Sequence, residues 1–331
     1  MATYKEIFGT NIEVLASDPA NPVQGQVWYN STDNVVKGAA ATTAGAWATG
    51  NDLNNPRFYL QGAGTQTSTI IAGGERNPGG NQAFAEVYDG TSWTEVADLN
   101  TARWGLGALG ADSTAAIVFG GATSETLTES WNNTSWSETG DLNTGRWGMG
   151  EAGDQTNGLI FAGIAPPALS PRIQTWVESW NGTSWTETTD LNTARYVLGS
   201  AGTQTSALGF GGNLLPGNSA ATESWNGTSW TEVNDLNTAR NFLGGFGASN
   251  TSALGFGGEP ATAITEEWNG TSWTETGDLN TARGGMATSG TVSAGLAAGG
   301  SGTPQLDSSI WPKTEEWTGA GSPLIQTFTD S

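Results

Sequence analysis

The sequence predicts an all-β fold, a six-bladed β-propeller with four antiparallel strands in each blade. Three observations support this prediction. A motif recurs every 43 to 49 residues, aromatic residues recur at fixed places within that period, and Gly, Thr, Ser and Asn interrupt every segment before a helical pattern can build up. A period of about 45 residues, made of short strands and turns, is typical of a propeller blade.

The recurring motif is Asp-Leu-Asn, with an Arg five residues after the Asp. A pair of small residues follows sixteen or seventeen residues later, and it is Gly-Gly in five repeats and Ala162-Gly163 in the third. The motif begins at Asp52, Asp98, Asp141, Asp190, Asp235 and Asp278. The repeats start near Arg57, Arg103, Arg146, Arg195, Arg240 and Arg283, so six of the eight arginines occupy one repeated position.

The fourth repeat shows how four strands fit into one period. Strand a is expected over 196–203, strand b over 206–212, strand c over 221–225 and strand d over 229–233. Strands of this length alternate with turn residues, and the same division applies to the other repeats. Each blade would therefore run from strand a to strand d in chain order.

The turn between strands c and d carries an Asn-Gly or a similar pair, such as Asn226-Gly227, which is typical of a two-residue type I′ hairpin. Such a turn would pair Trp230 with Glu223 and make Trp225 and Trp230 diagonal neighbours on one face. Two aromatic residues per blade would then take the place of the large aliphatic residues in which the chain is poor.

The two ends of the array each lack part of a blade. Trp317 has no Trp five residues later, and Trp47 has no aromatic residue five residues earlier. We expect the N-terminal strand around Trp47 to complete the last blade, which closes the ring without an open sheet edge. In the alternative arrangement, residues 324–328 form their own strand d and residues 23–50 lie outside the ring.

The composition excludes several kinds of chemistry. Because the 331 residues include no Cys and no His, the chain lacks disulfides, thiol nucleophiles and the commonest metal ligand and general base. The 11 basic and 32 acidic residues give a net charge of −21, which disfavours nucleic acid and anionic membranes as partners. We expect no metal, no cofactor and no membrane insertion, and acidic side chains that point outward from strands c and d.

The order of Arg, Gly-Gly, aromatic residue and Trp resembles the kelch repeat. In the fifth repeat these residues are Arg240, Gly257-Gly258, Trp268 and Trp273. The resemblance extends over roughly residues 47–320 and implies a kelch-like propeller, while it says little about activity.

Residues 1–38 are expected to form an N-terminal arm, and residues 39–331 the propeller. The arm contains Ser17-Asp18-Pro19-Ala20-Asn21-Pro22 and Gly25-Gln26-Val27-Trp28-Tyr29-Asn30-Ser31-Thr32. These segments resemble the leader of tail-associated structural proteins of bacteriophages, especially marine ones. The resemblance implies a virion protein whose arm contacts other virion proteins, with a hairpin over 28–36. The attachment residues would be Tyr4, Ile7, Phe8, Trp28 and Tyr29. No secretory signal is recognisable, so we expect synthesis in the host cytoplasm.

Two groups of aromatic residues are candidate contacts for a glycan or receptor. Trp104, Trp147 and Tyr196 directly follow the repeated Arg at the start of strand a, as does Phe58. They could form a collar for a sugar at the mouth of the channel, or pack between blades. Trp176 and Trp311 stand in the two longest loops between strands b and c, where each could stack on a sugar ring, cover the loop base or contact another subunit.

The six repeated Asp and Arg could form a charged ring that binds an ion. We instead expect a structural role, in which the Asp closes a turn and the Arg bonds backbone carbonyls and pairs with an Asp.

The chain is expected not to be an enzyme. Ser179 to Trp185 is reminiscent of the Asp-box of sialidases but is one residue shorter and has Asn for Asp, and no pair of carboxylates stands out from the repeats. The sequence thus favours a phage virion structural protein, a tail fibre, tail-associated or decoration protein, that presents the propeller for host-receptor recognition or particle assembly. A carbohydrate-binding, lectin-like propeller and a glycosidase are the alternatives, and a homo-oligomer remains open.

Overall fold

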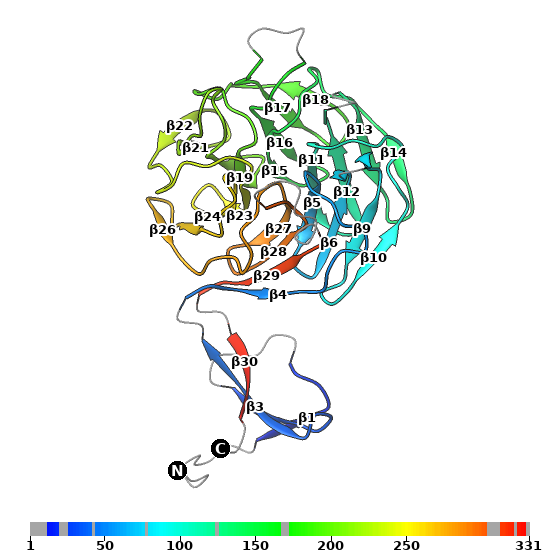
Figure 1. Ribbon diagram of the computed structural model, residues 1–331, viewed down its shortest axis with the longest axis vertical. Helices are drawn as coiled ribbons and strands as arrows, with labels where there is room; N and C mark the ends of the chain where they lie inside the picture. Colours follow the sequence, from blue (N-terminus) through cyan, green and yellow to red (C-terminus); the bar gives the residue numbers. More distant parts are fainter. Residues whose placement is uncertain are drawn as a thin grey trace. The chain divides into compact units, whose positions relative to one another are not determined.

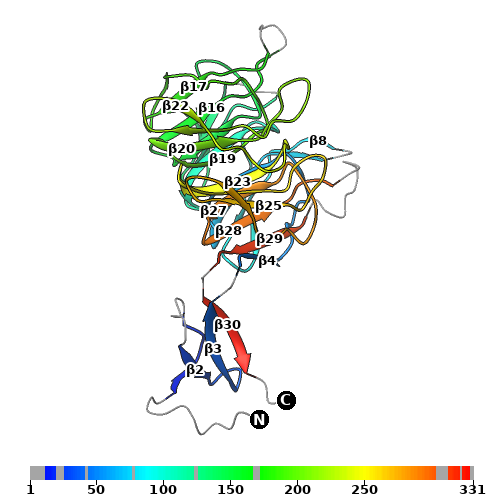
Figure 2. The same ribbon diagram turned by 90° about the vertical axis from the view of Figure 1, so that its left-hand side faces the viewer.

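The computed structural model describes residues 12–19, 26–41, 44–76, 79–122, 126–166, 172–302, 312–320 and 323–328. The chain divides into two compact units (Figures 1 and 2). Unit 1 consists of Met1–Gly45 with Gly319–Ser331, and unit 2 of Ala46–Thr318. The boundary expected between residues 38 and 39 is therefore corrected to 45 and 46, and the C-terminal segment belongs to unit 1. Over the described ranges, no helix is long and apolar enough to cross a membrane.

Unit 2 is a ring of six four-stranded antiparallel sheets, which confirms the predicted six-bladed β-propeller (Figure 1). In each blade strand a lies at the centre of the ring and strand d at the rim. Blades 1 to 3 consist of β5 (Gln61–Thr65), β6 (Ser68–Ala72), β9 (Ala85–Tyr88) and β10 (Trp93–Val96); β11 (Gly107–Asp112), β12 (Ala115–Phe119), β13 (Thr128–Trp131) and β14 (Trp136–Glu138); and β15 (Gly150–Gly153), β16 (Gly158–Phe161), β17 (Val177–Trp180) and β18 (Trp185–Glu187).

Blades 4 to 6 repeat this order, with one strand supplied from the start of the chain. They consist of β19 (Gly199–Thr203), β20 (Ser206–Phe210), β21 (Thr222–Trp225) and β22 (Trp230–Val233); β23 (Gly244–Ser249), β24 (Ser252–Phe256), β25 (Thr265–Trp268) and β26 (Trp273–Glu275); and β27 (Ala287–Thr291), β28 (Ala294–Ala298), β29 (Thr314–Thr318) and β4 (Ala46–Thr49). A small hairpin, β7 (Glu75–Arg76) with β8 (Gly80–Asn81), lies in the b to c loop of blade 1.

Strand β4 closes the ring, as predicted. It pairs with β29 so that Trp47 lies opposite Trp317, and both indoles are buried. The alternative, in which residues 324–328 complete blade 6, is wrong, because β30 (Pro323–Phe328) pairs with β3 (Val35–Ala41) in unit 1. The last blade is therefore held by hydrogen bonds between segments from opposite ends of the chain.

The hairpin between strands c and d differs from the prediction. Trp225 pairs directly with Trp230, and Glu223 with Glu232, so the loop has four residues rather than two. The reason is the Asn side chain, since Asn226 Oδ1 accepts the backbone N–H groups of both Thr228 and Ser229 at 2.9 Å. The two indoles still share a face and touch, with ring centroids 5.3 Å apart.

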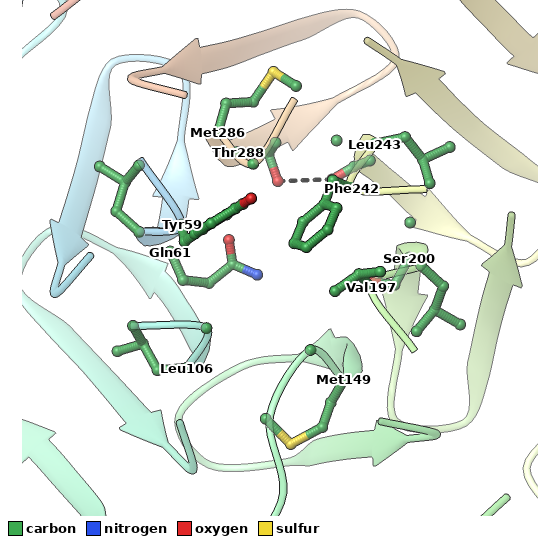
Figure 3. A pocket seen from close by; sticks show the side chains of 18 of the residues that line it. Tyr59, Gln61, Leu106, Met149, Val197, Ser200, Phe242, Leu243, Met286 and Thr288 are labelled. Carbon is green, nitrogen blue, oxygen red and sulfur yellow. Dashed lines mark hydrogen bonds between the residues drawn. The ribbon is translucent and has the colours of Figure 1, made fainter. Parts of the chain in front are cut away.

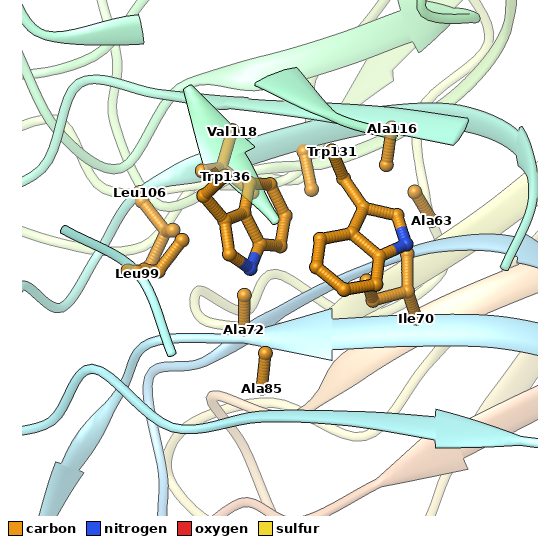
Figure 4. Packing of buried hydrophobic residues seen from close by; sticks show 11 residues of the cluster. Ala63, Ile70, Ala72, Ala85, Leu99, Leu106, Ala116, Val118, Trp131 and Trp136 are labelled. Atoms are coloured by element: carbon orange, nitrogen blue, oxygen red, sulfur yellow. The ribbon is translucent and has the colours of Figure 1, made fainter. Parts of the chain in front are cut away.

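Six clusters of buried residues fill the spaces between neighbouring blades. In the cluster between blades 1 and 2, Trp131 and Trp136 lie over Ile70 and small Ala side chains of the adjacent sheet (Figure 4). The indoles of one blade fill the space that the small Ala side chains of the next blade leave free. The two sheets can therefore pack closely without large aliphatic residues. This confirms the prediction that paired aromatic residues take the place of Leu and Ile in the core.

The repeated Arg is buried and structural, as expected, but its partner is a Glu of strand c rather than an Asp. Arg240 Nη2 lies 2.9 Å from Glu266 Oε1, and Arg240 Nη1 donates to the carbonyl of Ile264 at 2.6 Å. The other carboxylate oxygen of Glu266 accepts the N–H of Asn237 in the Asp-Leu-Asn loop at 2.7 Å. The six pairs are Arg57–Glu86, Arg103–Glu129, Arg146–Glu178, Arg195–Glu223, Arg240–Glu266 and Arg283–Glu315. One acidic side chain of each strand c thus points inward, which corrects the expectation that they all point outward.

Unit 1 is a four-stranded sheet made from both ends of the chain. β1 (Glu13–Leu15) runs parallel to β2 (Val27–Asn30), which forms the predicted hairpin with β3, and β30 completes the other edge. Trp28 is fully buried, and its indole donates to Asp18 at 3.0 Å. Tyr29 is partly buried in the same hairpin. The other predicted attachment residues, Tyr4, Ile7 and Phe8, lie outside the described residues.

Candidate functional site

The candidate site is the axial channel of the propeller, which the six innermost strands surround. Two cavities of about 80 and 100 Å³ lie along it. The first opens where the strands a begin, next to the Asp-Leu-Asn loops and the b to c loops. The second lies beside the glycines near the ends of the same strands. Because the channel is bounded by all six blades, any residue that departs from the repeat there makes the channel asymmetric.

A closed ring of six backbone hydrogen bonds defines the first mouth. The residue two positions after each repeated Arg donates its N–H to the carbonyl of the equivalent residue in the preceding blade, at 2.6 to 3.0 Å. The six residues are Tyr59, Gly105, Gly148, Val197, Phe242 and Gly285. All six have positive φ angles between 49° and 65°. This is the left-handed region, which suits glycine and strains other residues by about 1–3 kcal/mol each.

The three side chains in that ring extend into the channel. Figure 3 shows the Tyr59 and Phe242 side chains next to each other within the first cavity, with Val197 near Phe242. The rings of Tyr59 and Phe242 are stacked with centroids 4.7 Å apart. Three of the six equivalent positions therefore have a strained backbone, and at these three a bulky side chain narrows the channel. Backbone strain of this kind is concentrated at functional sites.

Three of the predicted contact residues lie together with this pair. Trp104, Trp147 and Tyr196 are each partly exposed and continue the row of aromatic rings around the mouth. The centroid distances are 5.5 Å from Tyr59 to Trp104, 4.9 Å from Trp104 to Trp147 and 5.6 Å from Trp147 to Tyr196. We call these five residues the collar: Phe242, Tyr59, Trp104, Trp147 and Tyr196. Phe58 is buried behind it.

The other predicted contacts do not join the collar. Trp176 is partly buried in the loop that leads into β17, and its carbonyl accepts the N–H of Ala162. Trp311 lies outside the described residues. The repeated Asp does not form an ion-binding ring either, since Asp278 Oδ1, for example, accepts the N–H of Thr265 at 3.0 Å. In the described part of the chain, no group of three or more acidic residues has a geometry that could hold a metal ion.

Below the collar, one hydrogen bond crosses the channel. Gln61 of blade 1 donates its side-chain amide to Glu151 Oε1 of blade 3, and these blades are not neighbours. Gln61 lines the first cavity and Glu151 the second, while Ser200 and Thr288 line both. The backbone N–H of Glu151 donates to Ser200 Oγ at 3.0 Å. The polar groups of the channel are thus gathered at one level.

Burial controls the protonation of the groups in and around the channel. It raises the pKa of Glu151 to about 8, although the hydrogen bond from Gln61 lowers this pKa. Burial also raises the pKa of Tyr59, and the nearby Glu259 and Glu75 carboxylates raise it further. Tyr59 hydrogen-bonds the Glu259 side chain, so its ring is held from the b to c loop of blade 5.

Sequence reasoning missed Tyr59, Phe242, Gln61 and Glu151. Their common signal is departure from the repeat, because each stands where most other blades carry a small residue. Glu151, for example, occupies a strand a position that holds Gly, Ala, Ser or Thr in the other five blades. All four show up when the six blades are compared position by position from the repeated Arg to the end of strand a.

No family model matches the chain, and no curated protein sequence matches it. Solved structures do resemble it. One of them, described as the structure of YjhT, has a TM-score of 0.64 and 13% sequence identity, and the match covers 83% of this chain and 99% of that one. A likeness at this identity supports the propeller fold and carries no information on activity.

Proposed function

We propose that the protein is a non-enzymatic virion component of a bacteriophage that displays the propeller for recognition of a glycan on the host surface. The observation that carries the recognition role is the collar, a continuous row of five aromatic rings at one mouth of the channel. The virion role rests on the resemblance of the N-terminal segments to phage tail-associated proteins.

The collar has the features of a sugar-binding surface. Partly exposed indole and phenol rings offer flat apolar faces with polar edges, which suits the apolar face of a pyranose. The rings pack against one another with centroids 4.7 to 5.6 Å apart, so little side-chain entropy is lost on binding. The b to c loop of blade 4 pairs with the backbone at Tyr196, and it would supply contacts to the rest of a glycan.

A non-enzymatic role is supported by the chemistry of the channel. Glycoside hydrolysis by the usual mechanisms needs two carboxyl groups facing the scissile bond. Among the described residues that line the two channel cavities, Glu151 is the one carboxylic residue. This favours recognition over a glycosidase, and a lectin-like propeller that acts without a particle is the second candidate.

The collar is tested by binding. We expect the full chain to bind at least one host-surface glycan on an array, and Trp147→Ala to weaken that binding about tenfold or more, because a central aromatic contact is lost. Trp176→Ala is the matched control in the same blade and should bind like the wild type. The recognition role is rejected if no glycan binds, or if Trp176→Ala rather than Trp147→Ala abolishes binding.

The attachment role belongs to unit 1. Because both chain ends form its sheet, the propeller is an insertion between β3 and β30. We expect Trp28→Ala, which removes its buried indole, to reduce co-sedimentation of the protein with phage particles, whereas Trp147→Ala should co-sediment normally. Equal association of both variants would exclude unit 1 as the attachment module.

A further inference from the structure

The channel contains an acidic group without a counter-charge. Glu151 is the sole carboxylic residue among the described residues that line either channel cavity, and none of those residues is Lys or Arg. Its Oε2 atom is buried and has no hydrogen-bond partner in the described structure. A buried carboxyl oxygen without a hydrogen-bond partner destabilises the folded state. A positively charged donor would supply both the missing hydrogen bond and the missing counter-charge.

Gln61 occupies the place that such a donor would take. Its amide reaches across the channel to Glu151 Oε1, and it is a neutral donor with one N–H directed at an acidic acceptor. The Gln61 side chain is partly exposed, and cavities of about 80 and 100 Å³ lie next to the two residues. A small ligand could therefore displace the amide and bond the carboxylate without any movement of the backbone.

The surroundings favour a cation over a neutral ligand. Tyr59, Phe242 and Trp147 line the first cavity together with Gln61, so an alkyl chain attached to the ammonium group would lie against aromatic rings. Glu259 and Glu75 act on Tyr59 at the mouth, and the whole chain carries a net charge of −21. This field raises the local concentration of small cations.

We propose that the axial channel binds a small primary alkylammonium compound, whose ammonium group replaces the Gln61 amide at Glu151 and whose alkyl chain extends toward Tyr59 and Phe242. The site shares Tyr59 and Phe242 with the collar, but the ammonium group is held at Glu151, which is not part of the collar, so the proposal does not depend on glycan binding.

Binding would be coupled to proton release. Because burial holds the Glu151 pKa at about 8, the carboxyl is protonated at neutral pH, and the cation must displace that proton. The apparent affinity should therefore fall about tenfold for each pH unit below 8 and level off above it. The groups that face Glu151 from other blades are Gln61, Ser200 and Thr288, none of which titrates in this range.

The test is calorimetric titration of the full chain with n-propylammonium, with 1-propanol as the uncharged probe of similar shape. The wild type should bind the cation and not the alcohol, with heats that depend on the buffer because a proton is released. Glu151→Gln keeps the shape of the side chain and should weaken binding about tenfold to a hundredfold. Glu138→Gln, at an exposed position on strand d, is the matched control and should bind normally.

Gln61→Ala removes the competing amide and should bind n-propylammonium several-fold more tightly, a gain that misfolding cannot produce. The proposal is overturned if the wild type does not bind the cation, if 1-propanol binds equally well, if Glu151→Gln binds like the wild type, or if Gln61→Ala binds more weakly.

Discussion

At the scale of single residues, the six buried Arg–Glu pairs determine how each blade is assembled. Each Arg reaches from the start of strand a to a Glu of strand c, and the same Glu accepts N–H groups from the Asp-Leu-Asn loop. Burial lowers the pKa of the Arg side chains, and the paired carboxylates oppose this shift. Since both charges are removed from water, breaking one pair leaves an uncompensated buried charge.

This leads to a prediction for blade 4. Glu223→Ala should lower the free energy of unfolding by about 3–5 kcal/mol, because Arg195 would stay buried without its partner. Glu232→Ala is the matched control, since Glu232 lies directly opposite on strand d but is exposed, and it should change stability by less than about 0.5 kcal/mol. Urea unfolding of both variants measures the difference, and similar stabilities would contradict the role given to the pair.

The repeated sequence made the Arg position predictable but not its partner. A residue present in every blade indicates a structural role, and this proved correct for the Arg. The partner is Glu rather than Asp because the carboxylate must extend from strand c to both the Arg and the Asp-Leu-Asn loop. The spacing of residues along the chain does not show this distance. The collar was predicted only in part, because Tyr59 and Phe242 occupy positions where other blades carry Gly or Val.

At the scale of elements, four of the six contacts between neighbouring blades include a hydrogen bond from the strand d Trp of one blade to the first residue of strand c in the preceding blade. Trp273 donates its indole N–H to Thr222 at 3.1 Å, and Trp185 donates to Thr128 at 3.2 Å. Blade 3 carries Val177 at this position, and the Trp230 indole N–H that faces it is buried with no hydrogen-bond partner among the described residues. One contact between blades is therefore incomplete for a reason visible in the sequence of a single strand.

We predict that Val177→Thr stabilises the protein by about 1 kcal/mol, because the hydroxyl gives the Trp230 indole an acceptor. The reverse change in the next blade, Thr222→Val, should cost about the same amount, because it takes the acceptor away from Trp273. Thermal unfolding of the two variants should show shifts of opposite sign. Two shifts of the same sign would show that the indole hydrogen bond does not stabilise the interface between blades.

The strands themselves were predictable, whereas one register was not. Turn residues marked the strand ends in the fourth repeat to within a few residues. The Asn-Gly pair favoured a two-residue hairpin on its own, but the following Thr and Ser N–H groups bond the Asn226 side chain and lengthen the loop. The turn preference of the Asn-Gly dipeptide does not take into account hydrogen bonds from backbone N–H groups to the Asn side chain.

At the scale of the whole molecule, closure of the ring was predictable because each end of the repeat array lacked what the other supplied. The pairing of Trp47 with Trp317 confirms it. The role of the C-terminal strand was not predictable, because β30 carries no repeat signal and its partner β3 stands near the other end of the chain. Segments from both parts of the chain that flank the propeller therefore belong to unit 1.

The central claim is that recognition takes place at the mouth with the collar. The chain has no Cys, so a single Cys can carry a bulky polyethylene glycol label on either face. Leu214→Cys places the label in the b to c loop beside Tyr196, and Thr205→Cys places it in the turn at the opposite end of the same blade. The decisive measurement is the affinity of the two labelled proteins for the glycan. Loss of binding with the label at position 214 alone is the expected result, and loss with the label at position 205 alone would contradict the account.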